Sequence, residues 1–146
     1  MWDFIVERRE QIAYNTFQHF NLVVQAVVVA TLIAVVLAVL VVGAPRLQGV
    51  ANAISAIGLT IPSFALVGLL LPVFSIGAFT AFLAVAFYAV LPVLRNAVVG
   101  LQQVDPTLVE SARGMGMSRL AVLWRIRLPL AWPVILAGVR ISMQMS

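Results

Sequence analysis

The sequence predicts an all-α protein, a bundle of helices that cross a membrane. Of its 146 residues, 63% are hydrophobic and only 10% are charged, against roughly half and a quarter in soluble proteins. Two long stretches, residues 11–45 and 47–94, contain no Asp, Glu, Lys or Arg. Because lipid offers the backbone no hydrogen-bonding partner, apolar stretches of this length are expected to be helical.

Residues 21–42 form the first predicted span, a run dominated by Val, Ala and Leu that can cross about 30 Å of hydrocarbon at 1.5 Å per residue. The stretch 47–94 is about twice as long as one crossing requires. We therefore predict a second span at about 50–72 and a third at about 78–100, with a turn in between where proline and glycine occur. A fourth span is expected to start at about 130 and to run to 146.

Two prolines lie inside the predicted spans, and each is expected to kink or interrupt its helix. They are Pro62, in the second span, and Pro92, in the third. Membrane helices tolerate such breaks where a neighbour or a cavity satisfies the freed carbonyl group, and breaks of this kind often line a pathway.

The charges predict how the chain is oriented in the membrane. Arginines that follow or end the third span mark the cytoplasmic side; they are Arg95, Arg113, Arg119, Arg125, Arg127 and Arg140. Region 101–130 is therefore predicted to be cytoplasmic and the N-terminus to lie outside. Residues 1–20 partly match an amphipathic helix, so we expect an extracytoplasmic or interfacial segment there.

The composition argues against an enzyme. All basic residues are arginine, cysteine is absent and His19 is the single histidine. A P-loop of the GxxxxGK[ST] type and Schiff-base chemistry both need lysine, and no constellation of nucleophile, base and metal ligands is present. We therefore expect no catalytic residue, cofactor or metal on this chain. The stretch 47–94 also lacks an acidic residue, which argues against a proton-coupled carrier.

Residues 104–129 are predicted to form two short helices joined by a glycine turn. Asp105 followed by Pro106 is typical of a helix start, because the carboxylate caps the helix and proline suits its first position. The first helix should end at Gly114 or Gly116. The second should begin at Ser118 and carry an apolar ridge and an arginine-rich flank.

Two residues, Leu128 and Pro129, are expected to close the second helix, because proline cannot continue a hydrogen-bonded turn. The element between the third and fourth spans is thus a helix, glycine turn, helix unit at the cytoplasmic surface. Its apolar ridge suits docking to a partner.

This element resembles a known motif. The signature EAA-x3-G-x9-I-x-LP is that of permease subunits of bacterial ABC importers, and the chain departs from it only at Ser111. If each of the six fixed residues occurs with an average frequency of about 6%, a chain of this length matches all six by chance with a probability on the order of 10⁻⁶ to 10⁻⁵. The matching residues are Glu110, Ala112, Gly116, Ile126, Leu128 and Pro129.

Three further blocks, 58–66, 88–96 and 104–106, are similar to those of the glycine betaine, carnitine and choline branch of that family. The resemblance implies a type I importer permease in the bacterial inner membrane, coupled to an ATP-binding subunit that holds ATP and Mg. It also implies a second permease subunit, identical or different, and an extracytoplasmic substrate-binding protein. Nucleic acid is not an expected partner. Because such permeases have at least five core spans, this chain is expected to be truncated.

In that family the EAA segment is the coupling helix, which lies in a groove of the ATPase. By position, Glu110 would make a charge-assisted contact to the ATPase. Ala112 would be a small surface residue that allows close approach, and Gly116 would form the turn between the two helices. Residues Ile126, Leu128 and Pro129 complete the candidate coupling set.

The implied substrates are quaternary ammonium compounds, which aromatic faces attract through cation–π interactions. Candidate pathway residues are Pro62, Phe64, Phe87 and Tyr88, with Phe79 and Phe82 as further aromatic candidates. Two alternatives remain open: a permease for another small solute such as an amino acid, and a small oligomeric channel or helper protein without an ATPase. A channel has no need for Glu110 and Gly116 at this spacing.

Overall fold

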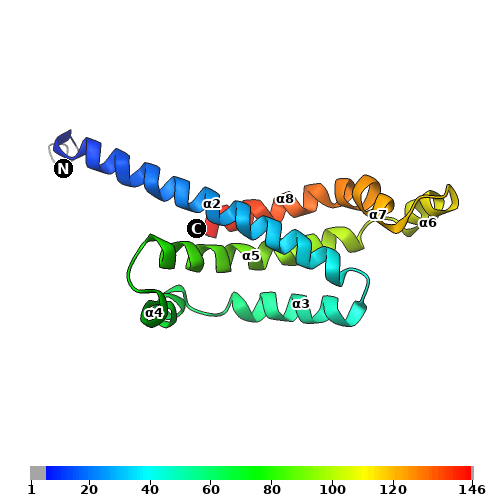
Figure 1. Ribbon diagram of the computed structural model, residues 1–146, viewed down its shortest axis with the longest axis horizontal. Coiled ribbons are helices and arrows are strands. Elements are labelled where there is room, and N and C mark those ends of the chain that lie inside the picture. The colour runs from blue at the N-terminus through cyan, green and yellow to red at the C-terminus, as the bar shows by residue number, and fades with distance from the viewer. Residues whose placement is uncertain (1–5, 146) are drawn as a thin grey trace.

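The computed structural model describes residues 6–145, which form helices joined by short turns (Figure 1). No strand occurs among these residues, so the predicted all-α class is confirmed. The elements are α2 (Arg9–Val41), α3 (Pro45–Gly58), α4 (Ser63–Phe74), α5 (Ala78–Gln102), α6 (Pro106–Gly114), α7 (Arg119–Val122), the π-helix η1 (Leu123–Arg127) and α8 (Leu128–Met145).

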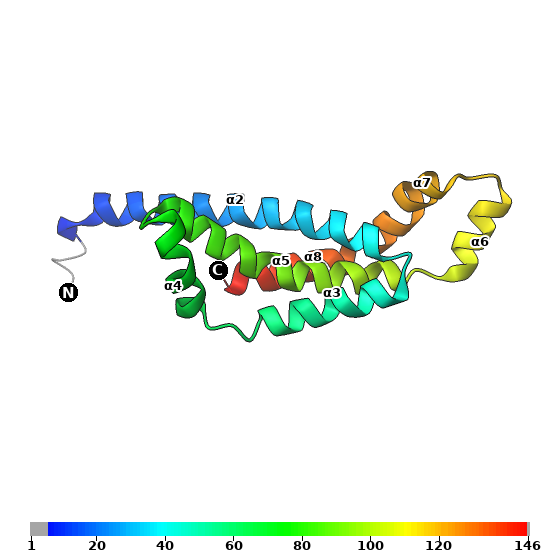
Figure 2. The same ribbon diagram turned by 60° about the horizontal axis from the view of Figure 1, so that its bottom comes forward.

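Helix α5 lies at the centre of the bundle, with α2 and α8 along its length and α3 on another side (Figure 2). Alanines recur every four residues on the face of α2 that packs inward, and all of them are fully buried: Ala26, Ala30, Ala34 and Ala38. Small residues in such a stripe let two membrane helices approach closely, which is how helices associate in lipid. In the main core, Ala34 and Ala38 of this stripe pack with Val93, Ala97 and Ile135.

Glycine allows the close crossing of α8 over α5. A Cβ added at Gly138 would lie 3.0 Å from the carbonyl oxygen of Pro92 and 3.0 Å from the Cα of Val93. Near the same crossing, the hydroxyl of Ser142 donates a hydrogen bond of 2.9 Å to the carbonyl of Ala89. These contacts fix α8 antiparallel to α5 and set their relative depth.

The predicted second span, 50–72, is not one straight helix. It is divided into α3 and α4, whose axes differ by 94° across a break of four residues. Pro62 is the N-cap residue of α4 and has extended backbone angles. Its ring also disfavours a helical conformation for the preceding residue, Ile61. By contrast, α5 runs unbroken through Pro92. Within residues 6–145, three helices are long and apolar enough to cross a membrane, or four if the bent pair is one span.

The expectation that Leu128 and Pro129 end the second short helix was wrong. Helices α7, η1 and α8 form one continuous 27-residue segment from Arg119 to Met145. The backbone N–H of Leu128 bonds to the carbonyl of Leu123, five residues back. This wider turn leaves room for the proline ring, which would clash with a carbonyl in an ordinary α-helix.

Residues 9–20 of the expected extracytoplasmic or interfacial segment continue α2 as one helix and project beyond the bundle (Figure 1), and residues 1–5 of that segment lie outside the described part. Arg140 does not lie with the other arginines that were predicted to mark the cytoplasmic side. It lies two residues from Ser142, level with the middle of α5.

Candidate functional site

Residues 104–127 form a helical hairpin, here called the 104–127 hairpin, that extends beyond the end of α5 (Figure 2). Its first helix, α6, starts at Asp105, whose Oδ1 accepts a hydrogen bond of 2.8 Å from the backbone N–H of Thr107. This backbone hydrogen bond lowers the pKa of Asp105 below its ordinary value of 3.8. The second helix starts at Ser118, whose hydroxyl oxygen accepts from the N–H of Ala121 at 3.3 Å.

Gly116 lies in the turn between the two helices with a φ of +83°. This left-handed conformation is unfavourable for residues with a Cβ. The N–H of Gly116 donates to the carbonyl of Arg113 at 2.9 Å, and the N–H of Met117 donates to the carbonyl of Ala112 at 3.1 Å. The turn therefore satisfies the last carbonyl groups of α6 in the manner of a glycine helix cap.

The hairpin has its own small hydrophobic core. Val104, Val109, Ala112 and Val122 are buried together, with Met117 and Ile126 packed against them. Ala112 is only 1% exposed, so its small side chain serves the packing of the two short helices. Because the hairpin itself covers Ala112, its side chain has no exposed surface for the expected contact with a partner.

The remaining signature residues separate into packing and surface positions. Ile126 packs against the hairpin core, whereas Leu128 belongs to the core of the bundle. Glu110, Gly116 and Pro129 are exposed. The signature thus combines a rigid hairpin, its attachment to the bundle and an exposed carboxylate.

Large apolar side chains on the 104–127 hairpin are exposed. Leu120 and Trp124 lie one turn apart and are 69% and 67% exposed. Arg119 and Arg125 are their neighbours in the sequence, and Glu110 and Arg113 are exposed on α6. We call Leu108, Met115, Leu120 and Trp124 the apolar surface of the hairpin. Exposed apolar residues rimmed by charge are typical of a protein interaction site.

A chain of amide groups holds the base of the hairpin. The side chain of Gln102, the last residue of α5, donates to the side-chain carbonyl of Gln48, which in turn donates to the backbone carbonyl of Val42. These hydrogen bonds join the ends of α2, α3 and α5 at the point where the hairpin begins. The hairpin is therefore fixed to the bundle at its base and, through η1, to α8.

The candidate pathway residues come together only in part. The hydroxyl of Tyr88 donates to the carbonyl of Ile61, the residue before Pro62, and the rings of Phe87 and Tyr88 meet edge to face with centroids 5.6 Å apart. These residues thus lie at the break between α3 and α4. Phe64 is 91% exposed and does not take part in this cluster.

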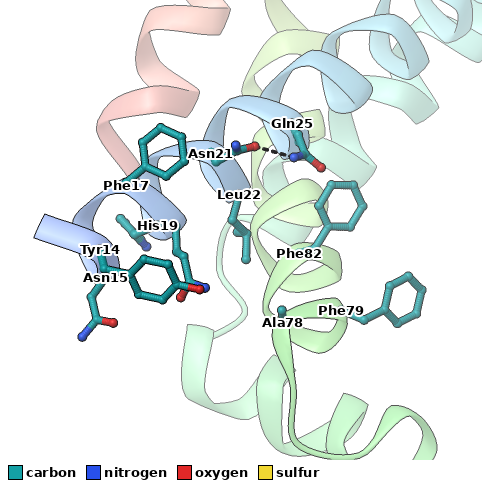
Figure 3. Close-up of a pocket in the computed structure, with 11 residues that line it drawn as sticks. Tyr14, Asn15, Phe17, His19, Asn21, Leu22, Gln25, Ala78, Phe79 and Phe82 are labelled. Carbon is teal, nitrogen blue, oxygen red and sulfur yellow. Dashed lines mark hydrogen bonds between the residues drawn. The ribbon is translucent and has the colours of Figure 1, made fainter. Parts of the chain in front are cut away.

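An open groove of about 940 Å³ lies between the first half of α2 and the start of α5 (Figure 3). Its aromatic lining comes from Tyr14, Phe17, Phe79 and Phe82, and its other polar residues include no Asp, Glu, Lys or Arg: Asn15, Gln18, His19, Asn21 and Gln25. Sequence reasoning selected the two phenylalanines of α5 but missed the groove. The signal was the pair Asn21 and Gln25, two amides one turn apart in an otherwise apolar run, which are hydrogen bonded to each other.

No group of three or more metal-binding side chains occurs in residues 6–145. The projecting hairpin is an element that can bind another protein. The aromatic groove and the cluster at the α3–α4 break can hold a small neutral or cationic molecule by aromatic contact.

The chain matches known membrane transport proteins over most of its length. The profile of the family described as "binding-protein-dependent transport system inner membrane component" matches residues 30–146. The choline transport system permease protein OpuBB of Bacillus subtilis is 37% identical over 90% of this chain and 61% of its own length. The glycine betaine/carnitine/choline transport system permease protein OpuCB of the same species is 34% identical over 97% of this chain and 65% of its own length.

A third relative is the osmoprotectant import permease protein OsmW of Salmonella typhimurium, which is 38% identical over 98% of this chain and 69% of its own length. The chain thus spans about two thirds of the length of these relatives, all of which are permease subunits. The predicted resemblance is confirmed. With its apolar helices, the chain is a multi-pass protein of the inner membrane. It belongs to the family of binding-protein-dependent transport system inner membrane components.

Proposed function

We propose that this chain is the membrane-spanning part of an ATP-driven importer for osmoprotectants of the glycine betaine, choline or carnitine kind. ATP and Mg bind to a separate ATP-binding subunit, which docks on the 104–127 hairpin. A second permease subunit and an extracytoplasmic substrate-binding protein complete the importer. The observation that carries this proposal is the hairpin itself, a rigid projecting element with an exposed apolar surface and an exposed Glu110.

The architecture of the hairpin supports a role in docking. Its helices pack on each other through Val109, Ala112 and Val122, so the apolar surface does not depend on the partner for its shape. Glu110, Arg113 and Arg119 provide charges of both signs around that surface. Charged rims of this kind set orientation and partner choice, whereas the apolar centre supplies most of the binding free energy.

The same features support a cytoplasmic position for region 101–130. Four arginines gather on this region: Arg113, Arg119, Arg125 and Arg127. Arg46 lies in the second residue of α3, at the same end of the bundle as the base of the hairpin (Figure 1). Positive charge is retained on the cytoplasmic side during insertion. The projecting start of α2 then lies outside the membrane on the opposite side.

The relatives' names and the aromatic residues support the substrate class. Quaternary ammonium groups bind to aromatic faces because the ring quadrupole attracts a cation that cannot donate a hydrogen bond. Phe87 and Tyr88 at the break between α3 and α4, together with the groove near Phe82, offer such faces on the path. The groove lining contains neither Lys nor Arg, which favours a cation there.

ATP-dependent uptake tests the proposal. The full-length subunit is assembled in proteoliposomes with its ATP-binding subunit and its binding protein. These vesicles should transport radiolabelled glycine betaine, choline or carnitine only when ATP is present on the side of the membrane where the ATP-binding subunit lies. Glu110→Arg should abolish uptake, because it places a cation where the docking carboxylate lies.

The control is Glu10→Arg, which makes the same charge change on the exposed start of α2 and should leave uptake intact. Uptake that does not require ATP would contradict the importer function and favour a channel. ATP-dependent uptake of only an unrelated solute, such as an amino acid, would contradict the substrate class alone.

A further inference from the structure

The groove between α2 and α5 lies at the boundary of the membrane that is opposite the hairpin. The apolar run 21–42 of α2 covers a hydrocarbon layer of about 30 Å, so residues 14–20 of the groove wall rise beyond that layer. The other wall, residues 78–82, is the start of α5. The 104–127 hairpin lies at the far end of the bundle (Figure 1). With the hairpin in the cytoplasm, the groove faces the side from which a binding protein delivers substrate.

The two walls of the groove differ in their chemistry. The α5 wall is aromatic, with Phe79 and Phe82, whereas the α2 wall carries a stripe of amide side chains at helical spacing: Asn15, Gln18, Asn21 and Gln25. The volume of about 940 Å³ is within the range of roughly 300–1,000 Å³ that is typical of small-molecule sites. The groove therefore offers rings for a cation and amides for a hydrogen-bonding group.

Gln25 orients the amide group of Asn21. The side-chain nitrogen of Gln25 donates a hydrogen bond to the side-chain oxygen of Asn21 (Figure 3). The oxygen and the nitrogen of a planar amide point in different directions, so the Nδ2 of Asn21 is turned away from Gln25. Asn21 thus presents N–H donors on the wall of the groove that it lines. Such donors suit an oxygen atom of a ligand and not an ammonium group.

A quaternary ammonium compound that also carries an oxygen group matches both walls. Its trimethylammonium group is a cation without an N–H, so the faces of aromatic rings attract it. Its oxygen group accepts a hydrogen bond from an amide, and this bond is stronger when the acceptor is a charged carboxylate than when it is a neutral hydroxyl. Glycine betaine and carnitine carry a carboxylate, whereas choline carries a hydroxyl.

We propose that the groove is the first substrate site of the permease, where Phe82 holds the ammonium group and Asn21 donates a hydrogen bond to the oxygen group. This inference rests on the proposed importer function and deepens it. Asn21 is a specificity residue that favours glycine betaine and carnitine over choline. Gln25 is a positioning residue, because it acts through the amide of Asn21.

Equilibrium binding of radiolabelled compounds to the full-length subunit in nanodiscs tests the two contacts separately. Asn21→Ala should weaken the binding of glycine betaine and carnitine about tenfold or more and that of choline about threefold, because only the carboxylate is a charged acceptor. Phe82→Leu should weaken the binding of all three compounds alike, by about threefold or more, and Phe82→Tyr should retain it, because the ring face is kept.

Two matched controls change the same kinds of side chain outside the groove lining. Gln11→Ala removes an exposed amide of α2, and Phe20→Leu removes an exposed ring of the same helix. Both variants should bind the three compounds as wild type does. A wild type that binds none of the compounds would overturn the inference, as would an Asn21→Ala variant that weakens choline as much as glycine betaine.

A double variant tests the positioning role of Gln25. Gln25→Leu should weaken the binding of glycine betaine less than Asn21→Ala does, because the donor remains but is no longer held in place. The two substitutions together should cost no more than Asn21→Ala alone, since Gln25 acts through Asn21. Losses that multiply would show that Gln25 acts independently and would contradict the positioning role.

Cysteine labelling tests whether the groove is accessible in the assembled importer. Residues 1–146 contain no cysteine, so Gln18→Cys adds the single thiol of this part of the chain, on the amide wall. The thiol should react with a membrane-impermeant methanethiosulfonate reagent added outside, and glycine betaine should slow the reaction. The Gln11→Cys thiol should react without protection. If the Gln18→Cys thiol does not react, another segment covers the groove and the inference is wrong.

Uptake by the assembled importer separates this inference from the proposed function. If the wild type shows ATP-dependent uptake of glycine betaine, and Asn21→Ala and Phe82→Leu leave its KM unchanged, the groove inference is wrong and the importer function stands. If glycine betaine protects the Gln18→Cys thiol but no ATP-dependent uptake occurs, the importer function fails and the binding site in the groove stands.

Discussion

Gly116 is the residue on which the turn of the hairpin depends, because its φ of +83° is left-handed. Gly116→Ala should destabilise the hairpin by about 1–2 kcal/mol, the usual cost of this conformation for a residue with a Cβ. The cost is conformational, since nothing lies within 4 Å of a Cβ built at Gly116. The thermal stability of the purified protein and proteolysis at Arg113 or Arg119 measure the effect.

Gly114 provides the matched control. It ends α6, has an ordinary backbone conformation and an equally open surrounding. Gly114→Ala should be neutral or stabilise the helix, because alanine is the better helix former by roughly 1 kcal/mol. Equal proteolysis of the two variants would contradict the role of the left-handed turn.

Asp105 makes the stability of helix α6 in the hairpin dependent on pH. The hydrogen bond from Thr107 N–H lowers the pKa of Asp105 in the folded state. The carboxylate therefore stabilises α6 fully above its ordinary pKa of 3.8, and this contribution disappears as the pH falls through the lower folded value. The protection of residues 106–114 against hydrogen exchange, expressed relative to the intrinsic exchange rate at each pH, should be higher at pH 7 than in acid.

Asp105→Asn separates charge from capping, because asparagine keeps an oxygen acceptor and is an equally good cap. This variant should protect residues 106–114 at neutral pH and lose the acid-dependent change at this site. If wild type and variant show the same pH dependence, the cap carboxylate is not its source.

At the scale of the elements, the crossing of α5 and α8 determines how the hairpin is connected to the bundle. Gly138→Ala places a Cβ 3.0 Å from two backbone atoms of α5, which cannot move as a flexible side chain can. We expect the variant to lose about 1–3 kcal/mol of stability, in the range for overpacked interiors. The melting temperature in detergent measures this loss.

Gly68→Ala is the control, because nothing lies within 4 Å of a Cβ at Gly68 in the middle of α4. It should be neutral or slightly stabilising. A melting temperature lowered as much by Gly68→Ala as by Gly138→Ala would contradict the close crossing.

The sequence predicted best the features that depend on local signals. Asp105, Ser118 and the two glycines predicted a helix, glycine turn, helix unit, because caps and turns are set by neighbours along the chain. Pro62 predicted a kink or interruption, and the structure has a break there. The size of the bend could not be predicted, because the packing of α3 on α5 and the bond of Tyr88 to Ile61 determine it.

Features that depend on distant contacts were missed. Pro129 was expected to end a helix, but the π-helical turn before it accommodates the ring. Ala112 was expected on the surface, but Val122, ten residues later, covers it. The groove joins residues 14–25 to residues 78–82, more than fifty residues apart in the sequence, so the amide pair of Asn21 and Gln25 marked one wall but could not predict the other.

On the scale of the whole molecule, the continuous segment from α7 through η1 to α8 connects the hairpin to the membrane bundle (Figure 2). Its N-terminal part contains Leu120 and Trp124 of the apolar surface, and its C-terminal part packs along α5 and carries Arg140. A partner that moves the hairpin would thus move α8 directly. A π-turn inside such a segment is a common place for a functional adjustment.

The most direct test of this account is co-purification of the tagged full-length chain with its ATP-binding subunit from the membrane. Wild type should retain the ATPase, whereas Glu110→Arg and Gly116→Leu should lose it although both remain folded and membrane-embedded. The Gly68→Ala variant, far from the hairpin, should retain it. If a well-folded wild type brings down no ATP-binding subunit, or if the hairpin variants bind it as wild type does, docking through the 104–127 hairpin is contradicted.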